Sequence, residues 1–538
     1  WRIKTMSKDQ IDQLKNPFTM DINRRQFVTS SLAAGIILPT AMAVAGTASA
    51  GAHKAGGKFR LGMGHGSTTD SLDPGTSENG MSQNVCFAYC NHLTEVSKEG
   101  NLIPELAVEY GASADAKTWT FKIRPGVTFH DGKALTPADV VGSFQFHMGE
   151  DTKSAGKSLL ADVTNIAISG DDVVFTLGNA SADFAFIVSD YHFPILPVRD
   201  GQLDWASGIG TGGYIMENYE PGVRAKFYRN PNYWKQDAAH FDEVELLVIL
   251  DVTARQNAMM NGDVDAIGRV DPKTVHLLAR NPTLDILETT GTLHYTFPMR
   301  CDASPFDNYD FRMACKLSVD REELVTKILS GHGAIGNDTP ISTANPFHNS
   351  DLAQRAYDPD KAAFHLKKAG YDGSNVQLSA SDAAFAGAVD AALLIKESAA
   401  KSGLNIEVVR EPKDGYWSNV WNKKPWSACY WGGRPTEDWM FTAAYMADGK
   451  WNDTAWRTGA SVERFNKLVL LGRAEVDLVK RREIYYECQA LVNNDGGALI
   501  PMFANNVHAL SKKLSHGPDV AANWELDGGK AAERWWFA

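Results

Sequence analysis

The chain has 538 residues, of which 44% are hydrophobic and 22% are charged, and its formal net charge at pH 7 is −12. A chain of this length is expected to form two or three domains, and its composition is ordinary for a globular protein. The acidic balance argues against nucleic acid as a partner, because neutralising phosphates requires a basic surface.

The first 50 residues have the pattern of an export signal. Residues 23–28 carry a twin-arginine motif, residues 32–44 form an apolar run, and residues 48–50 fit a small-residue cleavage site. A membrane anchor is the alternative, but the run is short for a bilayer and contains Pro39. We therefore expect export by the twin-arginine route, removal of residues 1–50 and a mature protein in the periplasm.

Residues 101–148 carry the most specific pattern in the chain. Apolar and polar residues alternate at 119–123, which predicts a half-buried strand. Pro-Gly and Asp-Gly turn pairs bracket a second short strand at 127–129, and a helix opens at Thr136-Pro137, where threonine can cap and proline suits the first position. The stretch resembles the signature of the bacterial extracellular solute-binding proteins of the peptide/nickel/opine type.

The resemblance extends over nearly all of residues 58–510. Gly208–Ile215 and Tyr228–Trp234 are similar to a "GTGPY…rNpdYW" block of that family. The other predicted elements are strands beginning at 58 and 242 and at 405–409, a hairpin at 163–177, and helices at 253–261, 308–317, 320–328, 357–371 and 391–404.

The resemblance implies an α/β protein with the two-lobed periplasmic-binding-protein fold, mixed sheets and a hinge between the lobes. It divides the first lobe into a base domain and an inserted subdomain. By this resemblance the base consists of 51–88, 209–292 and 503–538, the insert of 89–208, and the second lobe of 293–502.

The resemblance also implies a function. Members of the family bind nutrients and deliver them, and they usually perform no catalysis. We expect the periplasmic substrate-binding component of an ABC importer, a monomer that captures a small molecule or peptide-like compound and passes it to permease subunits in the inner membrane. An exported hydrolase, and a periplasmic ligand sensor or chaperone on the same fold, are the alternatives.

Sequence motifs give no support for an enzyme, a cofactor or a metal. The chain has no Gly-x-Ser-x-Gly elbow, His-Glu-x-x-His pair or phosphate-binding loop, and its histidines are scattered. Gly208-x-Gly210-x-x-Gly213 fits the dinucleotide fingerprint, but a strand-like segment follows where that fingerprint needs a helix. A tight turn is the favoured interpretation.

Residues 426–456 are the segment expected to face a ligand, since they contain five tryptophans and the sequence Gly432-Gly433-Arg434. Two glycines let the backbone approach a bound molecule, and an arginine can hold a carboxylate or phosphate through two hydrogen bonds. The alternative is an aromatic core with Arg434 paired to Glu437 or Asp438. The predicted ligand-binding residues are Tyr430, Trp431, Gly432, Gly433, Arg434, Asp438, Asn452 and Trp456 in the second lobe, and His65 and Tyr214 in the first.

The same segment bears on the class of ligand. The resembling peptide binders have an aspartate here that meets the free amine of the peptide, whereas this chain has Gly432-Gly433-Arg434. The difference favours a ligand with a carboxylate or another anionic group, such as an opine or a modified amino acid.

The six cysteines leave two alternatives. Export permits disulfides, but buried free thiols are the favoured state. Cys86 and Cys90 would share a helix face in a geometry that does not suit a bridge.

Overall fold

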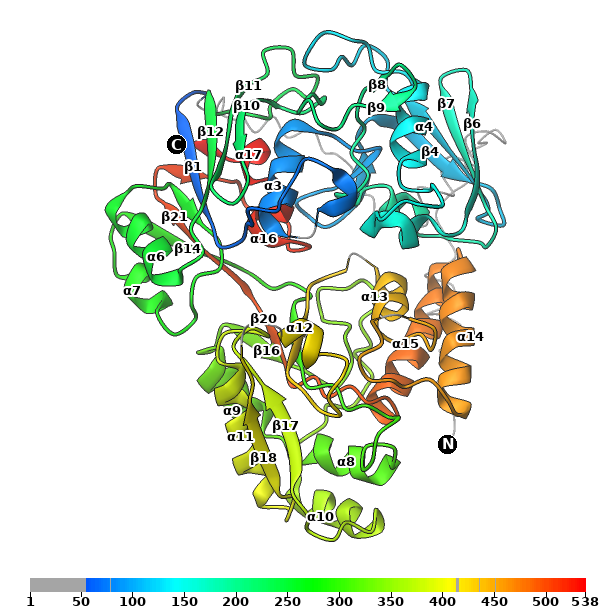
Figure 1. Cartoon of the computed structure of the whole chain (residues 1–538), viewed down its shortest axis with the longest axis vertical. Helices are drawn as coiled ribbons and strands as arrows, with labels where there is room; N and C mark the ends of the chain where they lie inside the picture. The colour runs from blue at the N-terminus through cyan, green and yellow to red at the C-terminus, as the bar shows by residue number, and fades with distance from the viewer. Residues whose placement is uncertain (1–54, 78, 413–415, 435, 450) are drawn as a thin grey trace, which may run out of the picture.

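The computed structural model describes residues 55–538, except 78, 413–415, 435 and 450. The predicted export signal at 1–50 therefore lies outside the described residues. Figure 1 shows an upper body, lobe I, and a lower body, lobe II, stacked along the long axis. Among the described helices, none combines the length and the apolar character needed to cross a membrane.

A seven-stranded sheet forms the centre of lobe I, in the order β10-β11-β12-β1-β13-β21-β14. The central strand β1 pairs in parallel with β12 and β13, and its Phe59 and Leu61 are fully buried. The strands are β1 (Lys58–Met63), β10 (Tyr214–Glu220), β11 (Arg224–Arg229), β12 (Glu243–Val248), β13 (Ala266–Ile267), β14 (Leu284–Thr289) and β21 (Asn506–Ser511). The remaining elements of this part are η2 (Pro74–Thr76), α3 (Gly80–Tyr89), α6 (Val252–Asn261), α7 (Val275–Ala279), β22 (Leu514–Ser515), α16 (Glu525–Gly528), α17 (Ala531–Arg534) and β23 (Trp536–Phe537).

The insert of lobe I, predicted at residues 89–208, contains a sheet of its own in the order β4-β5-β7-β6. The predicted strand at 119–123 is confirmed as part of β5, and α4 begins at Pro137 behind a capping box made by Thr136 and Asp139. The elements are β2 (Thr94–Val96), β3 (Leu102–Pro104), β4 (Ala107–Ala112), β5 (Thr118–Ile123), α4 (Pro137–Gln145), η3 (Ala155–Leu160), β6 (Val163–Ser169), β7 (Asp172–Leu177), α5 (Phe184–Ile187), β8 (Val198–Arg199) and β9 (Gln202–Leu203).

The predicted strand at 127–129 is wrong. Only a single bridge forms there, between Thr128 and Ala134, and Phe129 donates to the carbonyl of Lys133 across a tight turn. Two turns this close together leave too few residues to build a ladder.

Lobe II contains a four-stranded sheet, β16-β20-β15-β19, and a separate parallel pair, β17-β18. The predicted helices of this region are confirmed, and Asp320 caps the second of them by accepting from the backbone of Glu323. The elements are β15 (His294–Thr296), α8 (Tyr309–Leu317), α9 (Arg321–Ile328), β16 (Gly333–Ile335), α10 (Pro359–Lys368), β17 (Val376–Ala380), α11 (Ala388–Ala400), β18 (Ile406–Arg410), α12 (Tyr416–Asn419), β19 (Cys429–Trp431), α13 (Glu437–Ala444), α14 (Ala460–Ala474), α15 (Leu478–Asn494) and β20 (Met502–Ala504).

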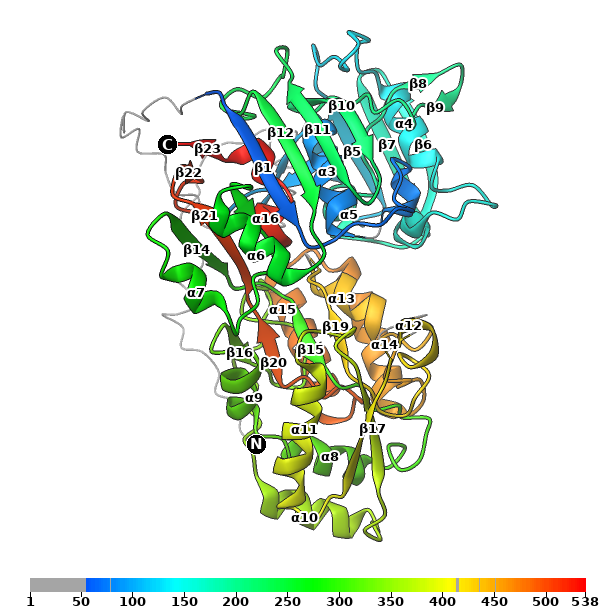
Figure 2. The same cartoon turned by 60° about the vertical axis from the view of Figure 1, so that its left-hand side comes forward.

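Two chain segments cross between the lobes side by side (Figure 2). The first leads from β14 to β15 and the second from β20 to β21. β14 pairs with β21 in lobe I, and β15 pairs with β20 in lobe II, both antiparallel. The crossing therefore consists of residues 290–293 and Asn505. The finer domain boundaries stay a prediction.

A second contact joins the lobes on the side opposite the crossing, and we call it the insert contact (Figure 1). Asp183 of the insert forms a buried ion pair with Arg481 of α15 at 2.5 Å, and the backbone of Ala182 donates to the carbonyl of Arg473 at 2.7 Å. Burial opposes the charge of Arg481, but Asp183 outweighs it and holds the pKa of Arg481 above its ordinary value.

All six cysteines lie in the described part of the chain, and all are free thiols. This agrees with the favoured interpretation of the sequence. Gly210 and Gly212 press against the backbone of Tyr89, where an added Cβ at Gly210 would lie 2.1 Å from the carbonyl oxygen. Strand β10 follows them, so the glycine-rich stretch is a tight packing turn.

Candidate ligand-binding site

Arg434 lies just beyond β19, on the side of lobe II that faces the insert. Its Nη1 donates to the carbonyls of Gly432 and Gly433, at 3.4 and 3.0 Å. Its Cζ lies 5.8 Å from the ring centres of both Trp431 and Trp439. The side chain is thus held between two aromatic faces, with part of its hydrogen-bonding capacity used by its own loop.

The predicted alternative partners of Arg434 are engaged elsewhere. Asp438 accepts from Nε of Arg473 at 3.1 Å, and Glu437 accepts from the backbone of Phe347 at 2.9 Å. Among the described residues no carboxylate lies within ion-pair distance of Arg434, and its buried Nε has no hydrogen-bond partner. The structure therefore differs from the salt-bridged alternative, because α13 turns both acids into lobe II.

Arg434 is a partly buried cation with weak compensation. Burial lowers the pKa of Arg434, and the acidic groups of Tyr191 and Asp190 in the insert oppose this effect only in part. A buried charge without a close partner is costly, whereas a bound carboxylate or phosphate can satisfy two N–H groups of a guanidinium at once. The geometry is suited to an anionic group that arrives from outside.

The two glycines differ in their surroundings. A Cβ on Gly433 would lie 1.9 Å from the Thr292 hydroxyl and 3.2 Å from the Asn523 carbonyl. Gly433 thus permits close approach of the protein's own crossing segment. A Cβ on Gly432 would meet only Arg434, at 3.9 Å, so there is room beside it.

Three of the predicted residues have their polar atoms satisfied inside one lobe. Asn452 is fully buried and donates to the carbonyls of Tyr445, Met446 and Trp456. Trp456 is 2% exposed and donates to Asp495. The hydroxyl of Tyr214 donates to the Ala532 carbonyl at 2.9 Å. The structure places Asn452, Trp456 and Tyr214 in the cores of the lobes.

The remaining predicted residues lie near a charged pair of lobe I. His65 accepts from the backbone of Gly80 at 3.0 Å, and burial and the charge of Arg269 lower the pKa of His65 to about 4. Arg269 pairs with Glu525 at 2.5 Å, and this pairing outweighs burial and lowers the pKa of Glu525 to about 2. Tyr430 of lobe II is close enough to raise the pKa of Arg269, so it faces this pair across the lobes.

Sequence reasoning missed the lobe I side of this region. Asp190, Tyr191 and Trp524 come from irregular segments, and their sequence neighbourhoods match no binding motif. Trp524 lies edge-on to Tyr191, with ring centres 5.8 Å apart. A polar and aromatic run interrupting the apolar residues at 184–196 was the available signal.

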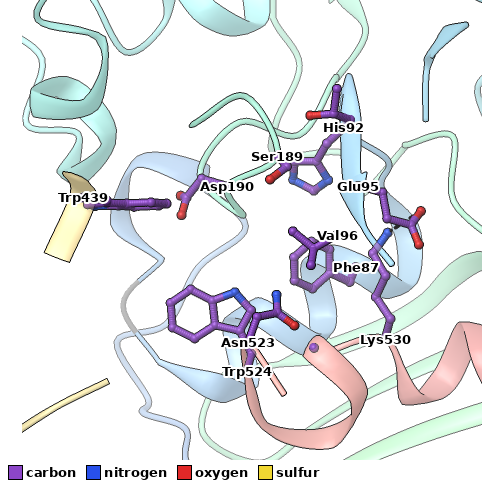
Figure 3. A pocket seen from close by; sticks show the side chains of 12 residues that line it. Phe87, His92, Glu95, Val96, Ser189, Asp190, Trp439, Asn523, Trp524 and Lys530 are labelled. Atoms are coloured by element: carbon purple, nitrogen blue, oxygen red, sulfur yellow. Dashed lines mark ion pairs between the residues drawn. The ribbon is translucent and has the colours of Figure 1, made fainter. Parts of the chain in front are cut away.

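A cavity of about 20 Å³ lies between the lobes at this place (Figure 3). Its volume suits about one water molecule. Trp439 is the lobe II residue in its wall, and the other lining residues belong to lobe I: Phe87, His92, Thr94, Glu95, Val96, Ser189, Asp190, Asn523, Trp524, Gly528 and Lys530.

Three buried carboxylates near this cavity, Glu95, Glu105 and Glu533, come close enough to hold a metal ion. Lys235 already lies among them, 2.7 Å from both Glu105 and Glu533. Lys530 adds a second ammonium 3.0 Å from Glu95 and from Glu105. The guanidinium of Arg534, 2.8 Å from Glu95, adds a third positive charge, so the cluster is an ion-pair network that ties the C-terminal segment to the insert.

We expect the free energy of unfolding to decrease in mild acid because His294 becomes protonated on unfolding. His294 begins β15 beside the crossing. Burial, together with the charge of Arg434, lowers the pKa of His294 to about 4, although a hydrogen bond to Thr292 opposes this. Between pH 6.5 and 4 the unfolded chain binds a proton that the folded chain does not, so stability declines as pH falls, by about 3 kcal/mol from this group at pH 4. Urea unfolding across this range measures the slope.

His294→Gln is the matching variant, because it removes the titration and keeps a hydrogen-bonding side chain. Its stability should depend less steeply on pH than that of the wild type. Equal slopes for the two proteins would show that His294 makes no such contribution.

Comparison with known proteins gives a consistent result. Residues 101–453 match the model for bacterial extracellular solute-binding proteins, family 5 middle region. The chain is 28% identical over 320 residues to a glutathione-binding protein of Pectobacterium atrosepticum, covering 57% of this chain and 60% of that one. It is 22% identical over 466 residues to di/tripeptide-binding protein 1 of Pseudomonas aeruginosa, covering 79% and 85%. The match thus spans about three-fifths of the first of these relatives.

Solved structures show the same fold. A periplasmic binding protein of A. tumefaciens R10 in complex with agropinic acid superposes with a TM-score of 0.76 at 22% identity, covering 90% of this chain and 99% of that one. A Campylobacter jejuni protein in complex with Ni(L-His) gives 0.75 at 17% identity, covering 89% and 99%. The fold predicted from the sequence is confirmed, and the chain belongs to the bacterial extracellular solute-binding proteins of family 5.

Proposed function

We propose that this protein is the periplasmic substrate-binding component of an ABC importer, exported by the twin-arginine route and acting as a monomer. It captures a small solute between its lobes and delivers it unaltered to permease subunits in the inner membrane. The proposal draws on the family and on the two-lobed fold with a paired crossing, since proteins of this architecture close around a ligand by bending at a hinge.

The observation that carries the ligand class is the guanidinium of Arg434. It lies partly buried between Trp431 and Trp439, it has an unused Nε, and no described carboxylate pairs with it. An opine, a modified amino acid, a peptide or another compound with a carboxylate would supply the missing partner. The relatives are named for different solutes, so the proposed ligand class depends on this chain's own residues.

Binding energy would be coupled to closure. A solute that contacts both lobes binds the closed arrangement more tightly than the open one, and it shifts the population toward the closed state by that difference. Closure also brings surfaces of both lobes together, which offers a permease a way to distinguish loaded from empty protein.

Native purification followed by mass spectrometry of the released small molecules tests the proposal. We expect an anionic solute that rebinds to the emptied protein and reduces its radius of gyration in small-angle scattering. The solute should be recovered unchanged after prolonged incubation. Chemical conversion of the solute would instead favour the exported hydrolase, and the absence of any retained or rebinding solute would contradict the proposal.

A further inference from the structure

The crossing between the lobes carries a hydrogen-bonded cluster to which both lobes contribute. Glu288 lies near the end of β14 in lobe I, and His332 lies between α9 and β16 in lobe II. Nδ1 of His332 is 2.9 Å from Oε2 of Glu288, and the side-chain amide of Asn505 donates to Oε1 of Glu288 at 2.6 Å. The backbone of Asn505 also donates to the carbonyl of His332, at 3.2 Å. We call these three residues the hinge cluster.

The position of the hinge cluster makes it sensitive to bending. β14 pairs with β21 above the crossing, and β16 pairs with β20 below it. Figure 2 shows β14 and β16 on the two sides of the crossing. Asn505 is the residue that links β20 to β21. A rotation of one lobe against the other at residues 290–293 and Asn505 therefore changes the distance between Glu288 and His332.

The histidine gives the cluster a charge that depends on pH. An ionised carboxylate only accepts hydrogen bonds, so Nδ1 of His332 donates to Glu288, and Nε2 is the atom that can gain a proton. The His332 side chain is 22% exposed, so solvent can deliver that proton. A histidine ordinarily becomes charged as the pH falls through about 6.5, and a glutamate loses its charge only near about 4.3. A histidine–glutamate pair is thus an ion pair in mild acid and a hydrogen bond from a neutral donor at pH 8.

The other charged groups on the elements around the hinge cluster do not replace this pair. They form the ion pairs Arg321–Asp338, Lys327–Glu323 and Asp285–Lys512. Glu322 of α9 is exposed to solvent, and β16 and β20 contain no charged residue. Burial lowers the pKa of His294 on β15 and of His508 on β21, which favours their neutral forms. Within the described part of the chain, Glu288 is the carboxylate at ion-pair distance from His332.

We infer that the hinge cluster is a pH-sensitive brace, which stabilises the present arrangement of the lobes more strongly in mild acid than at pH 8. Protonation of His332 turns its hydrogen bond to Glu288 into an ion pair, and hydrogen bonds between two charged groups are the stronger kind. A lobe rotation that separates the two side chains loses this contribution. Since the pair is partly exposed, the expected effect is about two- to fivefold in the ratio of closed to open molecules.

The brace acts on the empty protein, so the inference does not depend on the identity of the solute. One consequence rests on the proposed function. A solute held by both lobes binds the closed arrangement, so its apparent affinity should rise with the closed fraction as the pH falls.

The distance between the lobes tests the inference without a solute. Spin labels are attached to Asp171→Cys in the insert and to Glu463→Cys in α14, both at exposed positions, and Cys301→Ser removes the native thiol that is not fully buried. Double electron–electron resonance then measures the closed and open populations. The closed-to-open ratio should be about two- to fivefold higher at pH 5.5 than at pH 8. The same ratio at both pH values, or a single population at both, would overturn the inference.

Three variants assign the effect to the pair. Glu288→Gln removes the charge and keeps an acceptor for Asn505, and His332→Gln removes the titration and keeps a hydrogen-bonding side chain. Both should give the same closed-to-open ratio at pH 5.5 and at pH 8. His332→Lys is charged at both pH values and should keep the higher ratio throughout, which a general loss of structure would not produce.

Lys273 and Asp390 provide a matched control. They form another ion pair between the lobes, at 3.2 Å, with side chains that are 50% and 56% exposed. Lysine and aspartate ordinarily keep their charges between pH 5.5 and 8. Asp390→Asn should therefore lower the ratio by a similar factor at both pH values and leave its pH dependence intact. A pH dependence that survives in His332→Gln, or that disappears in Asp390→Asn, would also contradict the brace, and neither result bears on the proposed function.

Discussion

Replacing Arg434 by alanine is expected to weaken binding of the retained solute by about 30-fold or more, which corresponds to about 2 kcal/mol. The guanidinium lies between two tryptophan rings and has no described carboxylate partner, so an anionic ligand would provide its main compensation. Isothermal titration of the purified solute into wild-type and variant protein measures the loss.

The stability of the empty protein distinguishes a ligand contact from a structural role. Because Arg434 is a poorly compensated and partly buried cation, the empty Arg434→Ala variant should unfold at the same temperature as the wild type or at a higher one. Arg434→Lys should recover only part of the affinity, since lysine keeps the charge and loses the planar pair of donors. Arg410→Ala, at the exposed end of β18, is the control and should bind normally. Equal titration curves for Arg434→Ala and the wild type would contradict this role.

Replacing Asp183 by alanine should release the insert from lobe II. The change leaves Arg481 buried at the insert contact without its partner, and breaking a buried ion pair in this way costs about 3–5 kcal/mol. Because the pair joins two lobes, the free energy is lost from the closed arrangement. The variant should show a larger radius of gyration in small-angle scattering, and its apparent affinity should fall in proportion to the closed fraction.

Two further variants make this result specific. Asp183→Ala combined with Arg481→Met should be less impaired than Asp183→Ala alone, since an apolar side chain removes the uncompensated charge. Glu487→Ala breaks the exposed pair between Glu487 and Arg464, which also involves α15 but stays within lobe II, and little change is expected. An unaltered radius of gyration and affinity in Asp183→Ala would show that the insert contact does not hold the lobes together.

The regular elements were predictable because their signals are local. Turn residues, caps and alternation placed β5, α4 and most helices of lobe II within a few residues. The prediction of a strand at 127–129 was wrong because the sequence pattern there suits a turn as well as a strand. Long-range pairing, such as the parallel contact of β1 with β12, has no local sequence signal and was not predicted.

Only the lobe II side of the candidate site could be predicted from the sequence. Arg434 lies near Tyr191 and Asp190 of the insert, but its neighbour Trp431 lies in the core of lobe II. Trp456 and Asn452, from the same aromatic segment, also lie in that core. Aromatic composition marks residues that bury large surfaces, and it does not distinguish a core from a binding wall. Asp190 and Trp524 could not be found in this way, since their positions depend on how irregular segments of lobe I pack together.

The two crossing segments constrain how the molecule can move. β14 and β21 are hydrogen-bonded neighbours above the crossing, and β15 and β20 are neighbours below it. The connection therefore behaves as a two-stranded ribbon, in which neither strand can slide past the other without breaking the ladders at both ends. The two lobes can therefore move relative to each other only by bending at residues 290–293 and Asn505. These residues form a hinge with a single axis of rotation.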